Sequence, residues 1–444
     1  MKIAVINGSP KGDNSITLFT VKYLEKKYPQ ERFSYIPAAA RIRSYERSME
    51  EILPVLQEAE LILFSYPVYT FMVPSQLHRF LELLKREAEI GKVNLKGKYV
   101  SQISTSKHFY DVTAHKFIEE NAKDLGMNYI SGLSADMEDL TKKKGQKDAE
   151  DFFEYLLWSM HKNKKKRASS DRKEKPVVIV ADLKEEDLQL KEMIDCFQKK
   201  LALPSVLVNL REFHFQGGCL GCLRCASSGK CVYSDGFEEL LREKIQSGSA
   251  IVYAFTIQDH SMGSLFKTYD DRQFCNGHRT VTMGSPIAYL IHGQYSKEKN
   301  LEMILEARAQ TGGNFFAGAA ADENGTIGKE KTEEKIEKVA EKLCYAVENR
   351  YAPPSNFYGV GGMRIFRDLI YQMQGFMKED HKFFKKHGLY DFPQKKKGTI
   401  LLMYLLGAMM SSKKLRKAME SKMNEGMTMP YRKVLDQLDQ KKRK

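Results

Sequence analysis

The stretch that most constrains this chain is a small, polar loop near its beginning, which separates a buried strand from a helix. The β-branched, apolar run Ile3–Ile6 predicts a strand that is covered on both faces. After the loop, Leu18, Val21 and Leu24 recur at the spacing of one helical face. Such a loop leaves backbone N–H groups free at the N-terminus of the helix, where they and the helix dipole favour an anion. We therefore expect an anion site in this loop.

The loop also contains side chains that suit a phosphate group. Gly8 and Gly12 let the backbone approach a ligand closely. The candidate phosphate ligands are Ser9, Lys11, Asn14, Ser15 and Thr17. The loop lacks both the Gly-Lys-Ser/Thr ending of a P-loop and the G-x-G-x-x-G pattern of a dinucleotide site. The alternative is an ordinary strand-to-helix turn with a Ser/Thr cap.

Residues 7–17 resemble the FMN-phosphate loop of the flavodoxin-like NAD(P)H-dependent FMN reductases, which reads Gly-Ser-Pro-Lys/Arg, small residues, then Ser/Asn-x-Thr. A second loop, Tyr66–Pro74, resembles that family's flavin loop, Pro-Val-Tyr, and is followed by a similar helix start, Ser75–Phe80. A third loop, Ser104–Tyr110, offers polar groups for the flavin edge, whereas we expect a local or solvated role for His108. The resemblance implies further FMN contacts from Pro67, Val68, Tyr69, Thr70, Phe71, Thr105 and Ser106.

The pattern of strands and helices predicts two similar units in tandem. Strands and helices alternate over residues 1–160, which favours a parallel sheet with helices on both faces. The pattern restarts at Pro176, so the repeat has a period of roughly 175 residues. We expect an α/β protein with two flavodoxin-like, doubly wound domains. Its parts are an FMN-binding domain (1–160), a charged linker (161–175), a second domain (176–350) and a helical, basic extension (351–444).

The expected elements are as follows. In the first unit the strands are Ile3–Ile6, Phe33–Ile36, Leu61–Ser65, Tyr99–Ser104 and Tyr129–Leu133, and the helices are Thr17–Lys27, Met49–Ala59, Ser75–Glu89 and Thr113–Leu125. In the second unit the strands are Val177–Val180, Val206–Leu210, Ala250–Phe255, Thr280–Met283 and Pro286–Ile291, and the helices are Glu185–Lys200, Gly236–Ile245 and Leu301–Gln310. In the extension, Gly359–Gly362 reads as a hinge before a helix at Met363–Met377.

The second unit has diverged at the position of the phosphate loop. Its first strand is followed by Ala181–Asp187, which carries four carboxylates. Carboxylates suit the dipole at a helix N-terminus but would repel a phosphate. We therefore expect one FMN per chain, held by the first unit.

The second unit instead carries a cysteine motif with the spacing C-x₂-C-x₂-C-x₅-C, formed by Cys219, Cys222, Cys225 and Cys231. Three cysteines two residues apart, with glycines between them, can wrap three corners of a 4Fe–4S cubane, and the fourth closes the set. Zinc and unligated thiols are the alternatives. The motif resembles that of the iron–sulfur flavoproteins of the same superfamily, and Asp271-Arg272 resembles the family's Lys-x-x-x-Asp-Arg helix end. The remaining three cysteines read as structural, and this usage suits a reducing, cytoplasmic compartment.

Most of the net charge of +14 belongs to the C-terminal end of the chain. Residues 394–444 hold 14 Lys/Arg and 4 Asp/Glu, so we expect no nucleic-acid partner for the body. The apolar segment Thr399–Met410, between lysine clusters, is shorter than the ~18 residues that span a bilayer. It suits either a helix that packs on the domains or on a second subunit, or attachment to a membrane surface. The chain enters a strand directly, so we expect no signal peptide.

Taken together, the resemblance implies an FMN-dependent oxidoreductase. NAD(P)H would be the electron donor, and the electrons would pass through the flavin, and through a 4Fe–4S cluster if one is bound, to an unknown acceptor. Hydride transfer needs no protein acid or base, so we assign no catalytic residue. The related proteins work as homodimers, and this tandem chain is expected to be a monomer or a homodimer. The alternatives are an FMN electron carrier without NAD(P)H turnover and a non-enzymatic redox or interaction protein.

Overall fold

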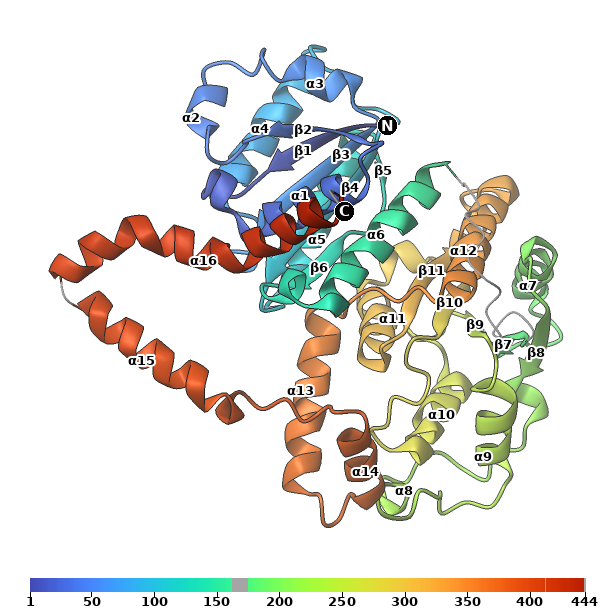
Figure 1. Cartoon of the computed structure of the whole chain (residues 1–444). Coiled ribbons are helices and arrows are strands. Elements are labelled where there is room, and N and C mark those ends of the chain that lie inside the picture. The colour runs from blue at the N-terminus through green and yellow to red at the C-terminus, as the bar shows by residue number, and fades with distance from the viewer. Residues whose placement is uncertain (162–174, 412, 443–444) are drawn as a thin grey trace. The chain divides into compact units, whose positions relative to one another are not determined.

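The computed structural model describes residues 1–161, 175–411 and 413–442 and divides the chain into two compact units (Figure 1). The first unit comprises Met1–Lys164 and Pro393–Lys444, and the second comprises Lys165–Phe392. The residues of the expected extension, 351–444, are therefore divided between the two units. Nearly all of the expected linker, 161–175, lies outside the described residues.

The first unit is built on one parallel sheet. Its strands are β1 (Lys2–Asn7), β2 (Arg32–Ile36), β3 (Leu61–Pro67), β4 (Tyr99–Ser106), β5 (Asn128–Tyr129) and β6 (Leu133–Asp136). Their order is β2-β1-β3-β4-β5, and β6 also pairs with β4. This is the 2-1-3-4-5 order of flavodoxin-like folds, in which ligands bind beyond the carboxyl ends of the strands. The apolar runs that predicted β1 and β3 are buried, because helices cover both faces of the sheet.

The helices of this unit follow the strands as expected. They are α1 (Ile16–Lys27), α2 (Ile42–Tyr45), α3 (Leu53–Glu58), α4 (Ser75–Glu89), α5 (Asp111–Asp124) and α6 (Lys143–His161), with short 3₁₀ turns η1 (Gly12–Asn14) and η2 (Asp139–Thr141). The helix expected at Met49–Ala59 begins only at Leu53, because Pro54 fits only the first turn of a helix. The single strand expected at Tyr129–Leu133 is wrong. It is broken into β5 and β6 at Gly132, which passes so close to Gln102 that a Cβ would lie 2.3 Å from its side chain.

The second unit repeats the first. Its parallel sheet contains β7 (Val177–Ala181), β8 (Ser205–Asn209), β9 (Ala250–Thr256), β10 (Pro286–His292) and β11 (Phe315–Ala321). The order β8-β7-β9-β10-β11 is again 2-1-3-4-5, which confirms the tandem flavodoxin-like fold. Its helices are α7 (Leu188–Lys200), α8 (Arg224–Ser228), α9 (Phe237–Glu239, continued by a π-helical turn), α10 (Ser264–Arg272), α11 (Lys299–Gly312), α12 (Lys329–Asn349), α13 (Phe357–Gln372) and α14 (Lys378–Lys386).

The repeat extends to the loops. The first residue after β1, Gly8, donates its N–H to the carbonyl of Ser65 at 2.8 Å, and the residue after β7, Asp182, donates to Ala254 at 3.0 Å. The turns after β3 and β9 also match. Tyr69–Met72 and Gln258–Ser261 each close with reciprocal backbone hydrogen bonds around two residues in the left-handed region. Each turn is followed by a helix that begins three residues later, at Ser75 and at Ser264.

Two expectations for the second unit are wrong, and one of its helices is missing from the expected elements. Thr280–Met283 forms turns rather than a strand, and the edge strand is β11, whose Ala- and Gly-rich sequence has little β-propensity. The long helix α12 was not expected at all. Gly359–Gly362 is not a hinge but lies inside α13. A Cβ on Gly359 would lie 2.6 Å from the carbonyl oxygen of Gln310, so this glycine allows α13 to pack closely against α11.

The C-terminal segment of the first unit consists of α15 (Lys397–Ser411) and α16 (Lys413–Lys442), and the latter reaches back to α1 (Figure 1). Large apolar side chains of α15 are exposed, whereas the last turns of α16 are partly buried against α1 and η2. Among the helices of the described residues, none combines the length and the apolar character that crossing a bilayer requires.

Candidate functional site

The loop after β1 is held in shape by the side chain of Asn7. Its Oδ1 accepts the N–H of Ser9 at 3.1 Å, and its Nδ2 donates to the carbonyl of Gly12 at 3.0 Å. Gly12 lies in the left-handed region (φ 54°), where a residue with a side chain would be strained. The loop therefore wraps around the amide of Asn7 and delivers the chain to the N-terminus of α1.

Hydroxyl groups gather at this N-terminus. Ser9, Ser15 and Thr17 are at most 2% exposed, Asn14 is half-buried and Lys11 is exposed. The first N–H groups of α1 have no partner within the helix. Ser15 occupies the N-cap position, but its side chain makes no capping hydrogen bond. The donors that the sequence predicted thus lie in the loop after β1 and in the first turn of α1.

The three expected loops meet at Thr105. The Thr105 hydroxyl lies 2.5 Å from that of Thr17, which joins the third loop to the first. The Thr105 carbonyl accepts the N–H of Val68 at 3.2 Å, which joins the third loop to the second. Segments that are far apart in the sequence therefore form one continuous rim.

The second loop is strained at its tip. Thr70 (φ 42°) and Phe71 (φ 70°) both lie in the left-handed region, between the paired residues Tyr69 and Met72. Such conformations cost on the order of 1–3 kcal/mol each and cluster at ligand sites. The Thr113 hydroxyl donates to the carbonyl of Phe71 and anchors the tip to α5.

The strained tip presents aromatic rings. Tyr69, Phe71 and Phe109 are 44%, 45% and 57% exposed. Phe71 lies 4.7 Å from Tyr110 and 5.3 Å from Phe109, measured between ring centroids. Phe109 and Tyr110 are not among the site residues that the sequence predicts, although two adjacent aromatic residues shortly after the end of β4 are a usable signal. Flat apolar walls beside polar loops suit a planar ring system.

Two histidines lie beneath this rim. His108 is buried, and its Nδ1 lies 3.0 Å from Asp111 Oδ2, so the expected local role is confirmed. Burial lowers the pKa of His115 to about 4, although Asp111 and Glu119 oppose this shift. The Nε2 of His115 lies 2.8 Å from the hydroxyl of Ser104. Both imidazoles therefore help to hold the loops in place.

The corresponding loop of the second unit is occupied by its own side chains. Asp182 takes the place of Gly8 and is buried against Arg211, whose Nε lies 2.7 Å from Asp182 Oδ1. The N–H groups of Leu183 and Lys184 donate to Asn209 Oδ1 (3.3 Å) and Asp187 Oδ2 (3.0 Å). These two backbone donors are therefore satisfied by amide and carboxylate oxygens of the protein, and the loop contains no hydroxyl side chain.

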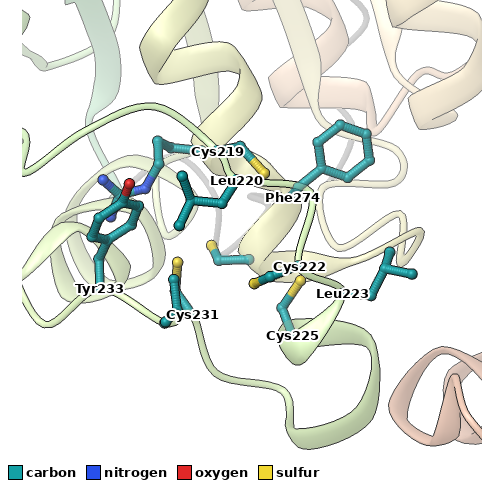
Figure 2. Close-up of a pocket in the computed structure, with 11 residues that line it drawn as sticks. Cys219, Leu220, Cys222, Leu223, Cys225, Cys231, Tyr233 and Phe274 are labelled. Atoms are coloured by element: carbon teal, nitrogen blue, oxygen red, sulfur yellow. The ribbon is translucent and has the colours of Figure 1, made fainter.

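The four cysteines of the motif line one pocket, together with Cys275 (Figure 2). Cys219 and Cys222 are exposed, and the left-handed Gly221 and Leu223 make the turns between them and Cys225. Within the described residues, no three His, Cys, Asp or Glu side chains are arranged to hold a metal ion. Burial raises the pKa of Cys225, and it raises that of Cys275 to about 12. The sequence did not indicate that Cys275, far along the chain, reaches the same pocket.

Arg272 ties the ends of the cysteine segment together. Its guanidinium makes two hydrogen bonds to Asp235, at 2.8 and 2.9 Å, and a third to the carbonyl of Gly217 at 2.8 Å. It also stacks 4.4 Å above the ring of Tyr233. Since Gly217 precedes and Asp235 follows the four cysteines, this arginine fixes the base of the whole segment.

The fold and the loops at the strand ends define the first unit as a flavodoxin-like domain. The sequence model of the NADPH-dependent FMN reductase family matches residues 1–132, so the resemblance to this superfamily is confirmed for the first unit. An iron–sulfur flavoprotein from Clostridioides difficile (strain 630) is 27% identical over 139 residues, which is 31% of this chain and 61% of that protein. The chain thus spans less than two thirds of the length of this relative.

Solved structures of similar proteins include an FMN-dependent NADH-azoreductase from Bacillus anthracis in complex with FMN. It is 16% identical with a TM-score of 0.28, and the match covers 35% of this chain and 98% of that one. A general stress protein 14 from Treponema denticola, also in complex with FMN, is 15% identical with a TM-score of 0.30, and the match covers 36% of this chain and 100% of that one.

Proposed function

We propose that this chain is an FMN-dependent oxidoreductase that takes electrons from NAD(P)H and passes them to an acceptor. The observation that carries the proposal is the meeting of three loops at Thr105, since the first loop contains buried hydroxyls and the other two carry exposed aromatic rings. These groups fit FMN in chemistry, because a phosphate needs donors at a helix N-terminus and a flavin ring needs flat walls. The family match over residues 1–132 supports the same cofactor.

Each part of the rim has its own task in this proposal. Ser9, Lys11, Asn14, Ser15 and Thr17 hold the phosphate, and Pro67, Val68, Tyr69, Thr70, Phe71, Thr105 and Ser106 hold the ring. When bound, FMN supplies the hydride acceptor and can release electrons one or two at a time. The exposed faces of Tyr69, Phe71 and Phe109 leave room for a nicotinamide to approach, and no side chain has to move a proton. An FMN electron carrier would share these features but would not oxidise NAD(P)H in steady state.

A single substitution tests the flavin site. Ser15→Asp keeps a good N-cap residue, so we expect the helix to form, but it puts a carboxylate where the phosphate should lie. We expect the purified variant to contain no FMN, whereas Ser15→Ala should keep most of it. Flavin released by denaturation is measured against protein, and circular dichroism checks the fold. Equal flavin content in the Ser15→Asp variant and the unmodified chain would show that this loop does not bind the FMN phosphate.

For the cysteine pocket we propose a 4Fe–4S cluster held by Cys219, Cys222, Cys225 and Cys231. Four thiols that line one pocket fit the donor chemistry of such a cluster, which would act as a one-electron relay. The name of the Clostridioides difficile relative points the same way. We also propose the reducing, cytoplasmic location that the cysteine usage of the sequence predicts.

Anaerobic metal analysis tests this second site. We expect about four irons and four sulfides per chain. Cys222→Ser should strip or convert the cluster and leave the flavin bound, whereas Cys196→Ser, outside the pocket, should change neither. Zinc without iron, or no metal after anaerobic reconstitution, would contradict the relay and leave a simple flavin reductase.

Of the two partners expected for the basic tail, a membrane surface and a second subunit, we propose an anionic membrane surface for α15. Its exposed apolar side chains are Ile400, Leu401, Leu402, Met403, Tyr404, Leu405 and Met409. A helix that is apolar on all sides favours an apolar environment. Residues 392–419 contain seven Lys/Arg and no carboxylate, and each basic residue near an anionic surface contributes on the order of 1 kcal/mol.

Vesicle co-sedimentation of the full chain tests the membrane proposal. We expect binding to vesicles that contain phosphatidylglycerol but not to phosphatidylcholine alone, with a loss of binding at high salt. Replacing Leu401 and Leu405 by Gln should abolish binding, whereas Ile365→Gln, which changes an exposed residue of α13, should not. Absence of vesicle binding, together with a change of oligomeric state in the double variant, would assign α15 to a subunit contact instead.

A further inference from the structure

The last turns of α16 are fixed against the first unit by several contacts. The Tyr431 hydroxyl donates to the carbonyl of Met137 at 2.7 Å, and its ring lies 6.0 Å from that of Phe19 on α1. Val434 and Leu435 are buried, and Asp439 pairs with Lys26 at 2.6 Å. The C-terminal helix therefore has a defined position beside the helix whose N-terminus forms the phosphate loop (Figure 1).

This position brings Arg432 to the loop. Its Nη2 lies 3.3 Å from Asn14 Oδ1, and its Nε donates to the Thr428 hydroxyl at 3.3 Å. A guanidinium can only donate hydrogen bonds, so the Asn14 atom that faces it must be the oxygen. The two N–H donors of the Asn14 amide are then available to a phosphate. Arg432 thus orients a side chain that the sequence already assigned to the phosphate site.

Arg432 also changes the charge at the loop. The loop contains the negative charge of Asp13, whose carboxylate lies 3.5 Å from the ammonium of Lys22. The positive charge of Lys22 is therefore paired with Asp13. Lys11 is exposed, and Arg432 is exposed as well, so its guanidinium keeps N–H groups that can reach a ligand. Arginine binds phosphate through two parallel charge-assisted hydrogen bonds, which a lysine ammonium cannot do.

We propose that Arg432 completes the FMN-phosphate site: it orients Asn14 and adds a positive charge to the phosphate of the flavin. This inference rests on the proposed FMN function, and it adds a ligand from outside the region that matches the family, residues 1–132. It makes retention of the cofactor depend on the C-terminal helix. A chain whose α16 is displaced would bind FMN more weakly, with the rest of the flavin site unchanged.

Flavin titrations of the full apo-chain test the proposal. Riboflavin is the matched ligand, because it has the same ring system but no phosphate. We expect Arg432→Gln to weaken FMN binding about tenfold at low salt, because the substitution removes a charge-assisted hydrogen bond to the phosphate. Riboflavin affinity should stay within about twofold, because the phosphate that Arg432 contacts is absent. The difference for FMN should shrink as salt is raised, because Arg432 is exposed to the solvent.

Two further variants complete the design. Arg432→Lys should recover part of the lost affinity because it restores the charge without the planar fork. Lys433→Gln removes the same charge from the next, exposed position and should leave both affinities unchanged. Equal FMN affinity in Arg432→Gln and the unmodified chain, or equal loss for FMN and riboflavin, would overturn the proposal. An unmodified chain that binds neither flavin would instead contradict the proposed function itself.

Discussion

At the residue scale, the buried pair of Arg272 and Asp235 determines how the cysteine segment is held. Arg272 is 1% exposed, and a charge in such a place is tolerated only when it is paired and hydrogen-bonded. Burial by itself raises the pKa of Asp235, but the hydrogen bonds from Arg272 and from backbone N–H groups outweigh it and leave the pKa below its usual value. The pair therefore stays ionised at neutral pH and holds the two ends of the cysteine segment together.

Breaking this pair should be costly. Arg272→Met leaves a buried carboxylate without its partner, and we expect it to lower the unfolding free energy of the second unit by about 3–5 kcal/mol. Denaturant unfolding followed by circular dichroism measures the loss. Combining Arg272→Met with Asp235→Leu should recover part of it, because no unpaired charge remains. Unchanged stability of Arg272→Met would show that the ion pair between Arg272 and Asp235 does not stabilise the second unit.

His115 gives the first unit a pH dependence. Its pKa is about 4 in the folded chain, whereas a histidine in an unfolded chain has a pKa of about 6.5. Between these values the unfolded state binds the proton first, so the contribution of His115 to stability is lost as the pH falls from about 6.5 to about 4. Melting temperatures across this range should show a decline that is shallower in His115→Gln. The same decline in both proteins would assign it to other groups.

At the scale of elements, the two C-terminal helices of the first unit behave in opposite ways. α15 exposes its apolar side chains, whereas α16 ends with Tyr431 buried beside α1. Composition alone would suggest the opposite, because α15 is apolar whereas α16 is rich in charged residues. The stability of the first unit should therefore depend on the second helix and not on the first.

A pair of tyrosines separates the two helices experimentally. Tyr431→Ala removes a buried ring and its hydrogen bond to Met137, and we expect it to lower the stability of the first unit by about 3 kcal/mol. Tyr404→Ala on α15 removes a ring that is 75% exposed and should leave the melting temperature unchanged. Equal effects of the two substitutions would contradict the described position of α16.

Much of the element order could be predicted from the sequence, because the buried strands β1, β3, β7 and β9 are short, apolar runs with clear ends. The prediction failed where local preference and packing disagree. β11 is rich in alanine and glycine and becomes a strand only because β10 provides its hydrogen-bonding partner. The glycines at the start of α13 suggest a break, but two of them, Gly359 and Gly362, allow close packing against α11.

The candidate site likewise has a part that the sequence predicts and a part that only the folded structure reveals. The hydroxyls and rings at the strand ends could be named because each follows a buried strand at a recognisable motif. Contacts between distant residues could not be found in this way. Neither the link between Thr17 and Thr105 nor the approach of Arg432 to Asn14 has a local signal, since both depend on how the fold brings the chain back on itself.

At the scale of the whole molecule, the two units share a fold and differ in what their strand ends offer. The loop after β1 presents buried hydroxyls, whereas the loop after β7 has no hydroxyl side chain and carries four carboxylates, of which Asp182 is buried against Arg211. The second unit carries the cysteine pocket in addition. We therefore predict a division of tasks within one chain, with the flavin in the first unit and the cysteine chemistry in the second.

The stoichiometry of bound FMN tests this division most directly. The full chain is saturated with FMN, freed of excess ligand by gel filtration and denatured, and the released flavin is measured against protein. We predict a ratio near one for the unmodified chain and near zero for Ser15→Asp. A ratio near two, or a ratio that stays near one in Ser15→Asp, would place a flavin in the second unit and contradict the account.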